Sequence, residues 1–485
     1  MSNGNIPVKP GKGPDVKSSG WSDFKSSLGE FWQEFSRVKY GKWGLVLLAI
    51  FILMIIFSSQ ITPFKEAGTR WSDIEYWEDN PQSAAPAWIN WFSSQKRTEH
   101  EILRDPEWKV IDRGRMKTYS GSFTYNYQYD IPPDELIFKA LSKGTVNMQV
   151  TLVRPDGEEI RMTQASVNSR KEQKVRAPMA NDAMFGAYRL ASRFESRENL
   201  EKINKNSINP IKVIFSRGQE GILINPSPLK GEYKVKIEGV AIGKDSYIKE
   251  PSLIVAGKVY GILGTDNAKR DIWSGIVVGT KWAMLIGLMT SFISVSVGVI
   301  YGVTSAYFGG WVDSAMMRVF EVFVSIPMLP VLIVVSAIFK PSIWLIILMM
   351  CIFYWTGPVR TVRSMGLQIK EETYIEAAKA LNASNSRIIF KHMIPQLIPY
   401  AFASMALSVP GAIVVEASLS LLGVGDTTIV TWGQILHGAH VNGAVLQGLW
   451  WWVIPPGLAI ALMGMTFAFI GFSMDKILNP KLKTR

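Results

Sequence analysis

The sequence predicts an all-α polytopic membrane protein with a large β-rich extracytoplasmic domain inserted between its first two transmembrane helices. Three observations lead to this fold class. Hydrophobic residues make up 48% of the 485 residues, and 17 Trp and 20 Met add more apolar material than one soluble core requires. The apolar residues are concentrated in six runs, each long enough to cross a bilayer. Between the first two runs, a long segment alternates apolar and polar residues as half-buried strands do.

The N-terminal segment, residues 1–42, is expected to be a cytoplasmic tail that ends in an interfacial helix. It opens with Gly, Pro and Lys and then places large apolar side chains on one helical face, which is typical of a helix lying among lipid headgroups. The next run follows too long a segment for a cleaved signal peptide, so residues 43–60 are interpreted as the first transmembrane helix. The interfacial face consists of Trp21, Phe24, Leu28, Phe31, Trp32 and Phe35.

Residues 61–255 are expected to form the extracytoplasmic β-rich domain. Apolar and polar residues alternate over 146–152, a Pro155-Asp156-Gly157 turn follows, and a second alternation covers 233–237. These patterns predict strands of an antiparallel sheet, with one helix between them. The apolar strand positions are Val146, Met148, Val150, Leu152, Tyr233, Val235 and Ile237, and the helical face consists of Met184, Ala187, Ala191 and Phe194.

Tryptophan is unusually dense in and around the start of this segment. We interpret these residues as a domain core or an interfacial belt in preference to a surface that stacks on sugars or on a partner. They are Trp71, Trp77, Trp88, Trp91 and Trp108.

The remaining chain, residues 256–485, is expected to hold five more transmembrane helices and a cytoplasmic loop over residues 359–398. At ~1.5 Å per residue, each run can cross ~30 Å of hydrocarbon. Lys and Arg are frequent in the N-terminal segment and in the tail after Phe472, whereas residues 424–448 contain none, so both termini are predicted to be cytoplasmic. The six runs are Trp43–Ser58, Trp282–Tyr307, Val319–Phe339, Ser342–Pro358, Pro399–Leu422 and Leu449–Phe472.

Several function classes are disfavoured by composition and motifs. The net charge of +12 comes without a basic stripe interleaved with base-stacking residues, so no nucleic acid partner is predicted. The single cysteine, Cys351, allows no disulfide within the chain and no Cys-based metal site. No Gly-x-x-x-x-Gly-Lys-Ser/Thr phosphate loop and no Gly-x-Ser-x-Gly elbow is present. His437 and His440 have a spacing compatible with a metal on a helix, but a plain external loop is the preferred interpretation, so neither a metal nor a cofactor nor a catalytic residue is assigned.

The cytoplasmic loop is expected to form two short helices with a tight corner. Glu372–Leu381 is a good helix former, Asn382–Ser386 is turn chemistry, and Arg387–Met393 resumes a helical pattern before Pro395. The corner requires a residue in the left-handed region, and Asn is the most tolerant residue after Gly.

Several ordered motifs carry a family resemblance. Glu376-Ala377-Ala378, followed by Asn382 and by Ile394-Pro395, resembles the "EAA" coupling signature of binding-protein-dependent ATP-binding-cassette permeases, although an isolated Glu-Ala-Ala is a common helical tripeptide. Further motifs are similar to those of the C-type permease subunit of dipeptide and oligopeptide importers, with a departure at Lys269, where the family usually has Gly. These motifs are Gly264-Thr265-Asp266 with Arg270-Asp271, Tyr307-Phe308-Gly309-Gly310 with Asp313 and Arg318, the run from Glu416 to Gly425, and Asn479 to Lys483.

The resemblance implies a permease subunit, not an enzyme, in an ATP-driven importer of the cell membrane. Its expected partners are a second homologous permease subunit, two ABC ATPase subunits that bind ATP and Mg, an extracytoplasmic substrate-binding protein and membrane lipid. The loop is expected to dock into a cleft of the ATPase, with small residues allowing close approach and Glu376 pairing with a basic group. The predicted coupling residues are Glu376, Ala377, Ala378, Asn382 and Ala383. Oligopeptide and oligosaccharide cargo both stay open.

Two acidic residues in the apolar runs are candidates for the translocation path. An uncompensated charge in lipid costs ~2.5 kcal/mol or more, so Glu321 and Glu416 are expected to face a cavity or a partner subunit. For Glu321, close to Arg318, a helix-end contact is preferred; for Glu416 both alternatives stay open. Pro410, with prolines in two other runs, is expected to interrupt its helix beside a path, ordinary kinked packing being the alternative. The other positions of interest are Pro327, Pro330, Pro455 and Pro456, and a small-residue ridge of Ser291, Ser294, Gly298 and Gly302 expected to allow close helix packing.

Two other function classes are weighed against the permease. A self-contained secondary carrier predicts two related halves and intramembrane ion-binding groups, and no such repeat is visible. A membrane-anchored receptor or enzyme requires one span in place of six, so receptor activity is retained only as an addition contributed by the external domain.

Overall fold

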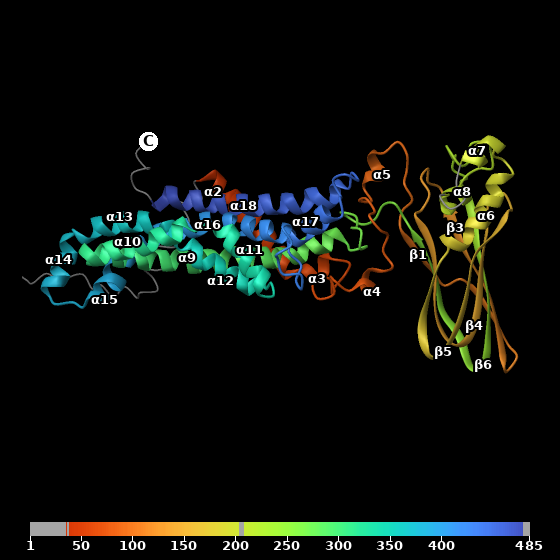
Figure 1. Ribbon diagram of the computed structural model, residues 1–485, viewed down its shortest axis with the longest axis horizontal. Helices are drawn as coiled ribbons and strands as arrows, with labels where there is room; N and C mark the ends of the chain where they lie inside the picture. The colour runs from red at the N-terminus through yellow and green to blue at the C-terminus, as the bar shows by residue number, and fades with distance from the viewer. Residues whose placement is uncertain (1–34, 36–37, 203–207, 479–485) are drawn as a thin grey trace, which may run out of the picture.

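The computed structural model describes residues 35, 38–202 and 208–478 and has an elongated shape (Figure 1). A bundle of long helices forms one end and a β-sheet domain forms the other, with short connecting segments between them (Figure 1). Of the predicted interfacial face, the positions from Trp21 to Trp32 lie outside the described residues, as does the C-terminal motif over residues 479–483. Phe35 is described and is buried in a small cluster with Val38 and Ile477.

The helical bundle is a polytopic membrane part. Within the described residues, five helical stretches are long and apolar enough to cross a membrane, and a bent helix pair raises the number to six if it counts as one span. The five stretches are Lys39–Ile56, which is α2, Ile272–Phe308, which is α9, Ile343–Lys370, Asn385–Leu421, and Trp450–Ile477 within α18, whose bounds are Trp450–Leu478.

The third predicted span is the bent pair. Helix α10 (Gly310–Ser325) and helix α11 (Met328–Ile338) meet at an angle of 72°. The interruption predicted at Pro327 is therefore present. Its cause is local, because the residue before a proline is pushed out of the helical region, and Ile326 has φ −79° and ψ 123°.

Two helices extend beyond the apolar runs predicted as spans. Helix α12 (Ile343–Tyr354) continues after one residue into α13 (Thr356–Lys370), so helical structure does not end at Pro358. Pro358 lies in the first turn of α13, where a missing N–H removes no helical hydrogen bond. Helix α16 (Ile394–Leu421) begins before Pro399 and runs through it, so the fifth apolar run is the later part of a longer helix.

The prolines predicted to interrupt the last two spans do not break them. Pro410 lies inside α16, and Pro455 and Pro456 lie inside α18. Protein neighbours around a transmembrane helix can accommodate a proline without ending the helix. Both helices are therefore continuous through these prolines, and the alternative of ordinary kinked packing stays a prediction.

The small-residue ridge of α9 is a close helix contact, as predicted. A Cβ added to Gly298 would lie 2.4 Å from the Trp355 carbonyl oxygen, and one added to Gly302 would lie 2.9 Å from the Val359 carbonyl oxygen. Only glycine therefore allows α9 to approach the junction of α12 and α13 this closely. Ser291 and Ser294 on the same helix are buried.

The β-rich domain is one six-stranded antiparallel sheet. Its strand order is β2-β3-β6-β4-β5, and β1 pairs with a second stretch of β6. The strand positions predicted from alternation are all buried, and two of them pair directly across the sheet, Val150 with Ile237 and Leu152 with Val235. The strands are β1 Glu101–Arg104, β2 Glu107–Asp112, β3 Met116–Tyr127, β4 Glu135–Val153, β5 Glu159–Pro178 and β6 Gly231–Ala256.

Helices cover one part of this sheet and complete its core. Helix α6 (Ala180–Ser192) packs on β5 and on the short helix α8 (Pro210–Ile214), and α7 (Arg197–Lys202) follows α6 in the chain. The predicted helical face is confirmed at Ala187 and Ala191, which are fully buried, but Phe194 lies beyond the helix and is 42% exposed.

The segment between α2 and the sheet packs with the helical bundle. It contains the short helices α3 (Ser58–Ile61), α4 (Ile74–Trp77) and α5 (Ile89–Phe92). Trp71 and Trp77 are buried in a cluster with residues of α9, α16 and α18. Trp108 packs against the core of the sheet domain, Trp88 contacts Trp450, and Trp91 is 82% exposed. The interpretation as core residues is thus confirmed for Trp71, Trp77 and Trp108.

Candidate functional site

The corner of the predicted coupling loop is built by a regular helix-ending motif. Helix α14 (Thr373–Ala380) ends where the Asn382 N–H donates to the Lys379 carbonyl at 2.9 Å and the Ala383 N–H donates to the Ala378 carbonyl at 3.0 Å. Asn382 has φ +56°, so the left-handed residue predicted at this corner is confirmed. Asn tolerates this region better than other residues with a side chain.

The predicted coupling residues divide into outward and inward positions. Glu376 and Ala377 are exposed, whereas Ala378 and Ala383 are half-buried against a cluster around Ile375. The neighbouring Leu381 is 84% exposed at the tip of the corner. Sequence reasoning missed Leu381, although a large apolar residue directly before a left-handed Asn in a polar loop is a usable signal.

The second half of the loop differs from the prediction. Helix α15 (Asn385–Ile388) runs through a π-helical turn, Ile389–Met393, directly into α16, so it is the end of the fifth span and not a separate short helix. Pro395 does not stop it and lies just after the π-helical turn, the kind of local irregularity that accompanies a proline inside a helix. The Ser384 hydroxyl caps α15 by accepting the Arg387 N–H at 3.3 Å.

Two contacts fix the corner to the rest of the bundle. The Tyr307 hydroxyl at the end of α9 donates to Asn385 Oδ1 at 2.7 Å, and the Lys379 ammonium lies 5.9 Å from the centre of the Tyr307 ring. These contacts connect the corner to the end of α9 and to α15, which leads into α16.

An ion pair holds the neighbouring helix ends together. Arg363 of α13 donates through Nε to Asp313 Oδ1 of α10 at 2.7 Å and through Nη2 to Asp313 Oδ2. The Ser305 hydroxyl of α9 also donates to Asp313. One carboxylate thus joins three helices near the coupling corner, and a two-pronged guanidinium contact sets their relative orientation.

Glu321 makes a helix-surface contact. Its carboxylate accepts from Arg318 Nη1 at 2.8 Å, and the two side chains are 52% and 83% exposed. This arrangement agrees with the helix-end alternative that the sequence favoured.

Glu416 is enclosed within the chain. It is 3% exposed, and Oε1 accepts from the Ser420 hydroxyl and from the Thr431 hydroxyl, each at 2.8 Å. Thr431 also caps helix α17 (Trp432–Val441) by accepting the Gln434 N–H at 3.2 Å. The carboxylate therefore joins α16 to the start of α17.

The third path candidate lies beside a cavity. A cavity of about 300 Å³ is lined by Ser408 and Gly411, on either side of Pro410, and by Ser294 and Tyr354 from the facing helices. Pro410 thus lies between two residues that line this cavity.

The Gly264 to Asp271 motif joins the start of α9 to the segment before the sheet. The Thr265 hydroxyl donates to the Pro81 carbonyl at 2.7 Å and accepts the Ala84 N–H at 2.9 Å. Asp266 accepts from the Arg270 N–H at 2.8 Å and from Arg270 Nε at 2.6 Å. Burial raises the pKa of the Asp266 carboxyl, and the adjacent Arg270 guanidinium opposes that rise.

Lys269, where the resemblance departs from its family pattern, lies in the same motif. It has φ +65°, the conformation in which glycine is most at ease. Its ammonium donates to the Glu78 carbonyl at 3.2 Å, and its own carbonyl accepts from Asn80 Nδ2 at 3.0 Å. Asp271 caps α9 by accepting the Ser274 N–H at 2.8 Å.

The histidine pair lies on a helix and not in the plain loop that the sequence favoured. His437 and His440 are both in α17, and His437 Nδ1 lies 3.0 Å from the Leu421 carbonyl oxygen. Within residues 35, 38–202 and 208–478, no group of three or more His, Cys, Asp or Glu side chains could hold a metal.

Two family models match the chain. One, described as a binding-protein-dependent transport system inner membrane component, matches residues 294–484. The other, described as the N-terminal TM domain of oligopeptide transport permease C, matches residues 26–84. The segment that forms the sheet lies between these two matches.

Named relatives are similar over the permease part. The dipeptide transport system permease protein DppC of Bacillus subtilis is 34% identical over 221 residues, which is 45% of this chain and 68% of that protein. The oligopeptide transport system permease protein OppC of Haemophilus influenzae is 34% identical over 223 residues, 46% of this chain and 71% of that protein. Among solved structures, a chain of the inward-facing MetNI methionine ABC transporter is 18% identical, covers 44% of this chain and 98% of that chain, and has a TM-score of 0.34, too low to support an argument.

Proposed function

We propose a function from one premise: this chain belongs to the family of binding-protein-dependent transport system inner membrane components, in the branch of the dipeptide and oligopeptide permease C proteins. On that premise, the chain is a permease subunit of an ATP-driven oligopeptide importer. Proteins of this family are multi-pass membrane subunits and not enzymes. ATP hydrolysis, with ATP and Mg bound, therefore belongs to partner ATPase subunits.

One observation carries the coupling role: an exposed helical corner at the end of the bundle farthest from the sheet (Figure 1). Glu376, Ala377 and Leu381 point away from the chain's own core, so they are free to contact another protein. Ala378 and Ala383 act differently, because they pack the corner onto the ends of the membrane helices. The corner combines a charge, a small residue for close approach and an apolar tip, which suits a small docking interface.

In the proposed mechanism, the exposed corner and the ends of α9 and α16 move together. An ATPase that closes on ATP moves the corner, and the contacts of Tyr307 and Asn385 pass that movement to α9 and α16. With a second, related permease subunit on the other side, this movement opens the path alternately to each side of the membrane. Both termini and the corner are then cytoplasmic, and the sheet domain is outside, where a substrate-binding protein delivers cargo.

The cargo is proposed to be oligopeptide. The named relatives transport dipeptides and oligopeptides, which favours peptide over the oligosaccharide alternative. For the path, Pro410 is the best supported candidate because a cavity adjoins it. Glu416 is retained as a candidate that becomes exposed only if α16 rearranges. Glu321 is retained as a candidate that is already half exposed on the surface of α10.

The test uses the native complex, purified through a tag on this chain and reconstituted in nanodiscs. Mass spectrometry identifies the subunits and the ligand retained by the binding protein, and ATP hydrolysis is measured with and without loaded binding protein. Glu376→Lys and Ala377→Trp change the exposed face of the corner without entering its core. We expect both to reduce stimulated hydrolysis at least tenfold, because one central contact in a small interface can be worth ~2 kcal/mol.

The matched control is Glu238→Lys, an exposed charge change on β6 of the sheet domain. It should leave stimulated hydrolysis unchanged. Normal stimulation in both corner variants, or a complex that contains no ATPase subunit, would contradict the coupling role. A sugar in place of a peptide on the binding protein would overturn the cargo assignment alone.

A further inference from the structure

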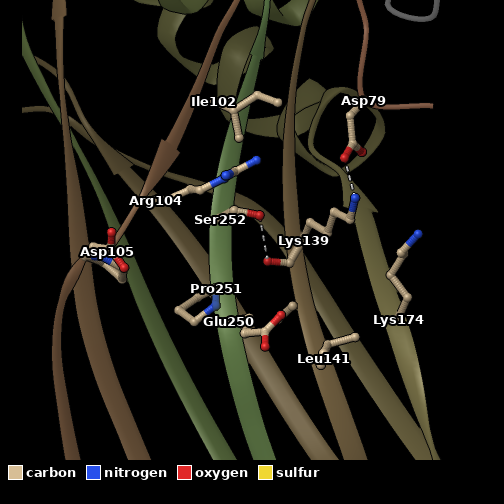
Figure 2. A pocket seen from close by; sticks show the side chains of 12 residues that line it. Asp79, Ile102, Arg104, Asp105, Lys139, Leu141, Lys174, Glu250, Pro251 and Ser252 are labelled. Atoms are coloured by element: carbon tan, nitrogen blue, oxygen red, sulfur yellow. Dashed lines mark hydrogen bonds and ion pairs between the residues drawn. The ribbon is translucent and has the colours of Figure 1, made fainter. Parts of the chain in front are cut away.

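The sheet domain contains a hollow of about 480 Å³ on the side nearest the connecting segment. It lies where β1 leads into β2 and where β4 faces β6 (Figure 2). Its apolar part is formed by Ile102, Ala140 and Leu141, and charged side chains surround that part. A volume of this size is within the range of pockets that bind small ligands, about 300–1,000 Å³.

The backbone around the hollow is held in conformations that most residues avoid. Asp105 has φ +55° and Glu250 has φ +48°, and each directly precedes a proline. Positive φ is unfavourable for a residue with a side chain, and a residue before proline prefers extended backbone. The backbone conformation of both residues is therefore unfavourable for two separate reasons. The pairing of β4 with β6 also shifts register between Lys139 and Leu141, opposite Glu250. Strained backbone of this kind is concentrated at binding sites in folded proteins, because the surrounding structure is built to maintain it.

The lysines at one wall of the hollow are already neutralised by this chain. Lys139 forms an ion pair with Asp79, and Lys174 Nζ lies 2.8 Å from Glu78 Oε1. Figure 2 shows Lys139 reaching from β4 toward Asp79, away from Glu250. A ligand that used these lysines would have to displace their carboxylates.

The other charged side chains of the hollow have no such partner. Within the described part of the chain, Arg104, Asp105 and Glu250 take part in no side-chain hydrogen bond or ion pair. Figure 2 shows Arg104 toward one end of the hollow, Glu250 toward the other and residues of β6 between them. One unpaired positive charge and two unpaired negative charges thus surround an apolar floor.

We propose that this hollow binds a short peptide in its zwitterionic form, with the peptide carboxylate on Arg104 and the peptide ammonium on Glu250. A guanidinium pairs with a carboxylate through two parallel hydrogen bonds, which gives direction as well as attraction. The Glu250 carboxylate can accept hydrogen bonds from the ammonium, and the floor of Ile102 and Leu141 accepts a small apolar side chain. The site requires both peptide termini to be free.

This inference rests on the proposed function, because it names a peptide site on the importer's own external domain. Such a site would raise the local concentration of cargo above the path. It is separate from the coupling corner, which lies at the opposite end of the molecule (Figure 1).

The test measures binding to the full chain in nanodiscs, without a binding protein, by isothermal titration calorimetry. The probes are tri-alanine, tri-alanine amide, which lacks the carboxylate, and N-acetyl-tri-alanine, which lacks the ammonium. On the unmodified chain we expect each capped peptide to bind at least tenfold more weakly than tri-alanine. This comparison needs no variant, so it does not depend on how a substitution affects folding.

Two variants then assign the termini. In the Arg104→Gln variant, tri-alanine amide should bind as well as tri-alanine, while N-acetyl-tri-alanine should still bind more weakly. In the Glu250→Gln variant, N-acetyl-tri-alanine should bind as well as tri-alanine, while tri-alanine amide should bind more weakly. Glu238→Gln on the same strand is the control and should behave like the unmodified chain. Gln keeps the shape of the Glu side chain and leaves the strained backbone of β6 unchanged.

Three outcomes would overturn the proposal: no binding of tri-alanine, equal binding of all three peptides, or an amidation effect that persists in Arg104→Gln. Binding of maltotriose that Arg104→Gln removes would assign the hollow to a saccharide and would also overturn it. None of these outcomes depends on stimulated ATP hydrolysis. A failure of the coupling experiment with intact peptide binding here, or the reverse, therefore separates the two proposals.

Discussion

Replacing Leu381 with serine is expected to weaken docking of the ATPase without weakening the permease itself. Leu381 is 84% exposed at the tip of the coupling corner, so its side chain contributes little to the chain's own core. Burying a whole leucine side chain is worth about 1.5–3 kcal/mol, so 84% of that, about 1.3–2.5 kcal/mol, is available to a partner. At 1.4 kcal/mol for each factor of ten, Leu381→Ser should weaken ATPase binding roughly 8- to 60-fold.

The measurement is the affinity of purified ATPase subunit for the permease complex in nanodiscs, with thermal stability of the permease recorded in parallel. The matched control is Leu446→Ser, because Leu446 is 93% exposed and lies between α17 and α18, away from the corner. Both variants should unfold within about 0.5 kcal/mol of the unmodified chain, as surface substitutions do. Affinity within twofold of the unmodified complex for Leu381→Ser, or an equal loss for Leu446→Ser, would refute the reasoning.

Three further predictions concern the supporting structure. Burial lowers the pKa of His100 to about 4 from a usual value of 6.5, so its stabilising contribution is complete above pH 6.5 and is lost as the pH falls toward 4. Going from pH 7 to pH 5 should cost the sheet domain about 2 kcal/mol, measured by hydrogen exchange of β4 and β6, and His100→Gln should remove that dependence. Asn382→Val should destabilise the corner by about 1–2 kcal/mol in hydrogen exchange of α14, whereas Asn382→Gly should not, because of the left-handed φ. Asp313→Asn should lower thermal stability by about 2 kcal/mol by leaving Arg363 unpaired; an unchanged melting temperature would show that the pair contributes nothing.

The parts of the fold that periodicity determines were predictable from the sequence. Alternation identified buried strand positions such as Val150 and Leu152, because side chains on a strand point to opposite faces in turn. Apolar runs identified the membrane helices, and turn chemistry identified the left-handed corner at Asn382. Each of these signals lies within a few residues of the chain, so no knowledge of tertiary contacts is needed.

The boundaries of the helices were less predictable, because a proline can either separate two helices or lie within one. At Pro327 it separates two helices at 72°, whereas Pro358 lies in the first turn of α13 and Pro395 follows a π-helical turn inside a continuous helical stretch. The local sequence does not state which case applies, since the answer depends on whether the preceding residues already form a helix. Two helical stretches, Ile343–Lys370 and Asn385–Leu421, therefore extend into the loop predicted over residues 359–398.

The partners of the candidate sites were not predictable at all from local pattern. Lys139 forms an ion pair with Asp79, and the Glu416 carboxylate accepts a hydrogen bond from Thr431. The partners of each pair lie on different elements joined by loops, and hydrophobic periodicity does not predict how loops bring elements together. The hollow between Arg104 and Glu250 depends on a register shift between β4 and β6, which arises from sheet pairing. Exposure of Leu381 is likewise a tertiary property, because an apolar residue in a loop is as often buried as free.

One short segment, around Glu78 and Asp79, carries contacts both to the sheet and to the start of the membrane helix α9. The segment around Glu78 and Asp79 is held on one side by basic residues of the sheet, including Lys139, with side chains only 19–34% exposed. On its other side, Asn80 binds the Lys269 carbonyl, two residues before the cap of α9. Pulling the sheet away would therefore expose acidic side chains without partners and disturb the start of α9. Both costs fall on the same short segment, so a ligand bound in the hollow beside Asp79 would lie next to the contacts that connect the sheet to α9.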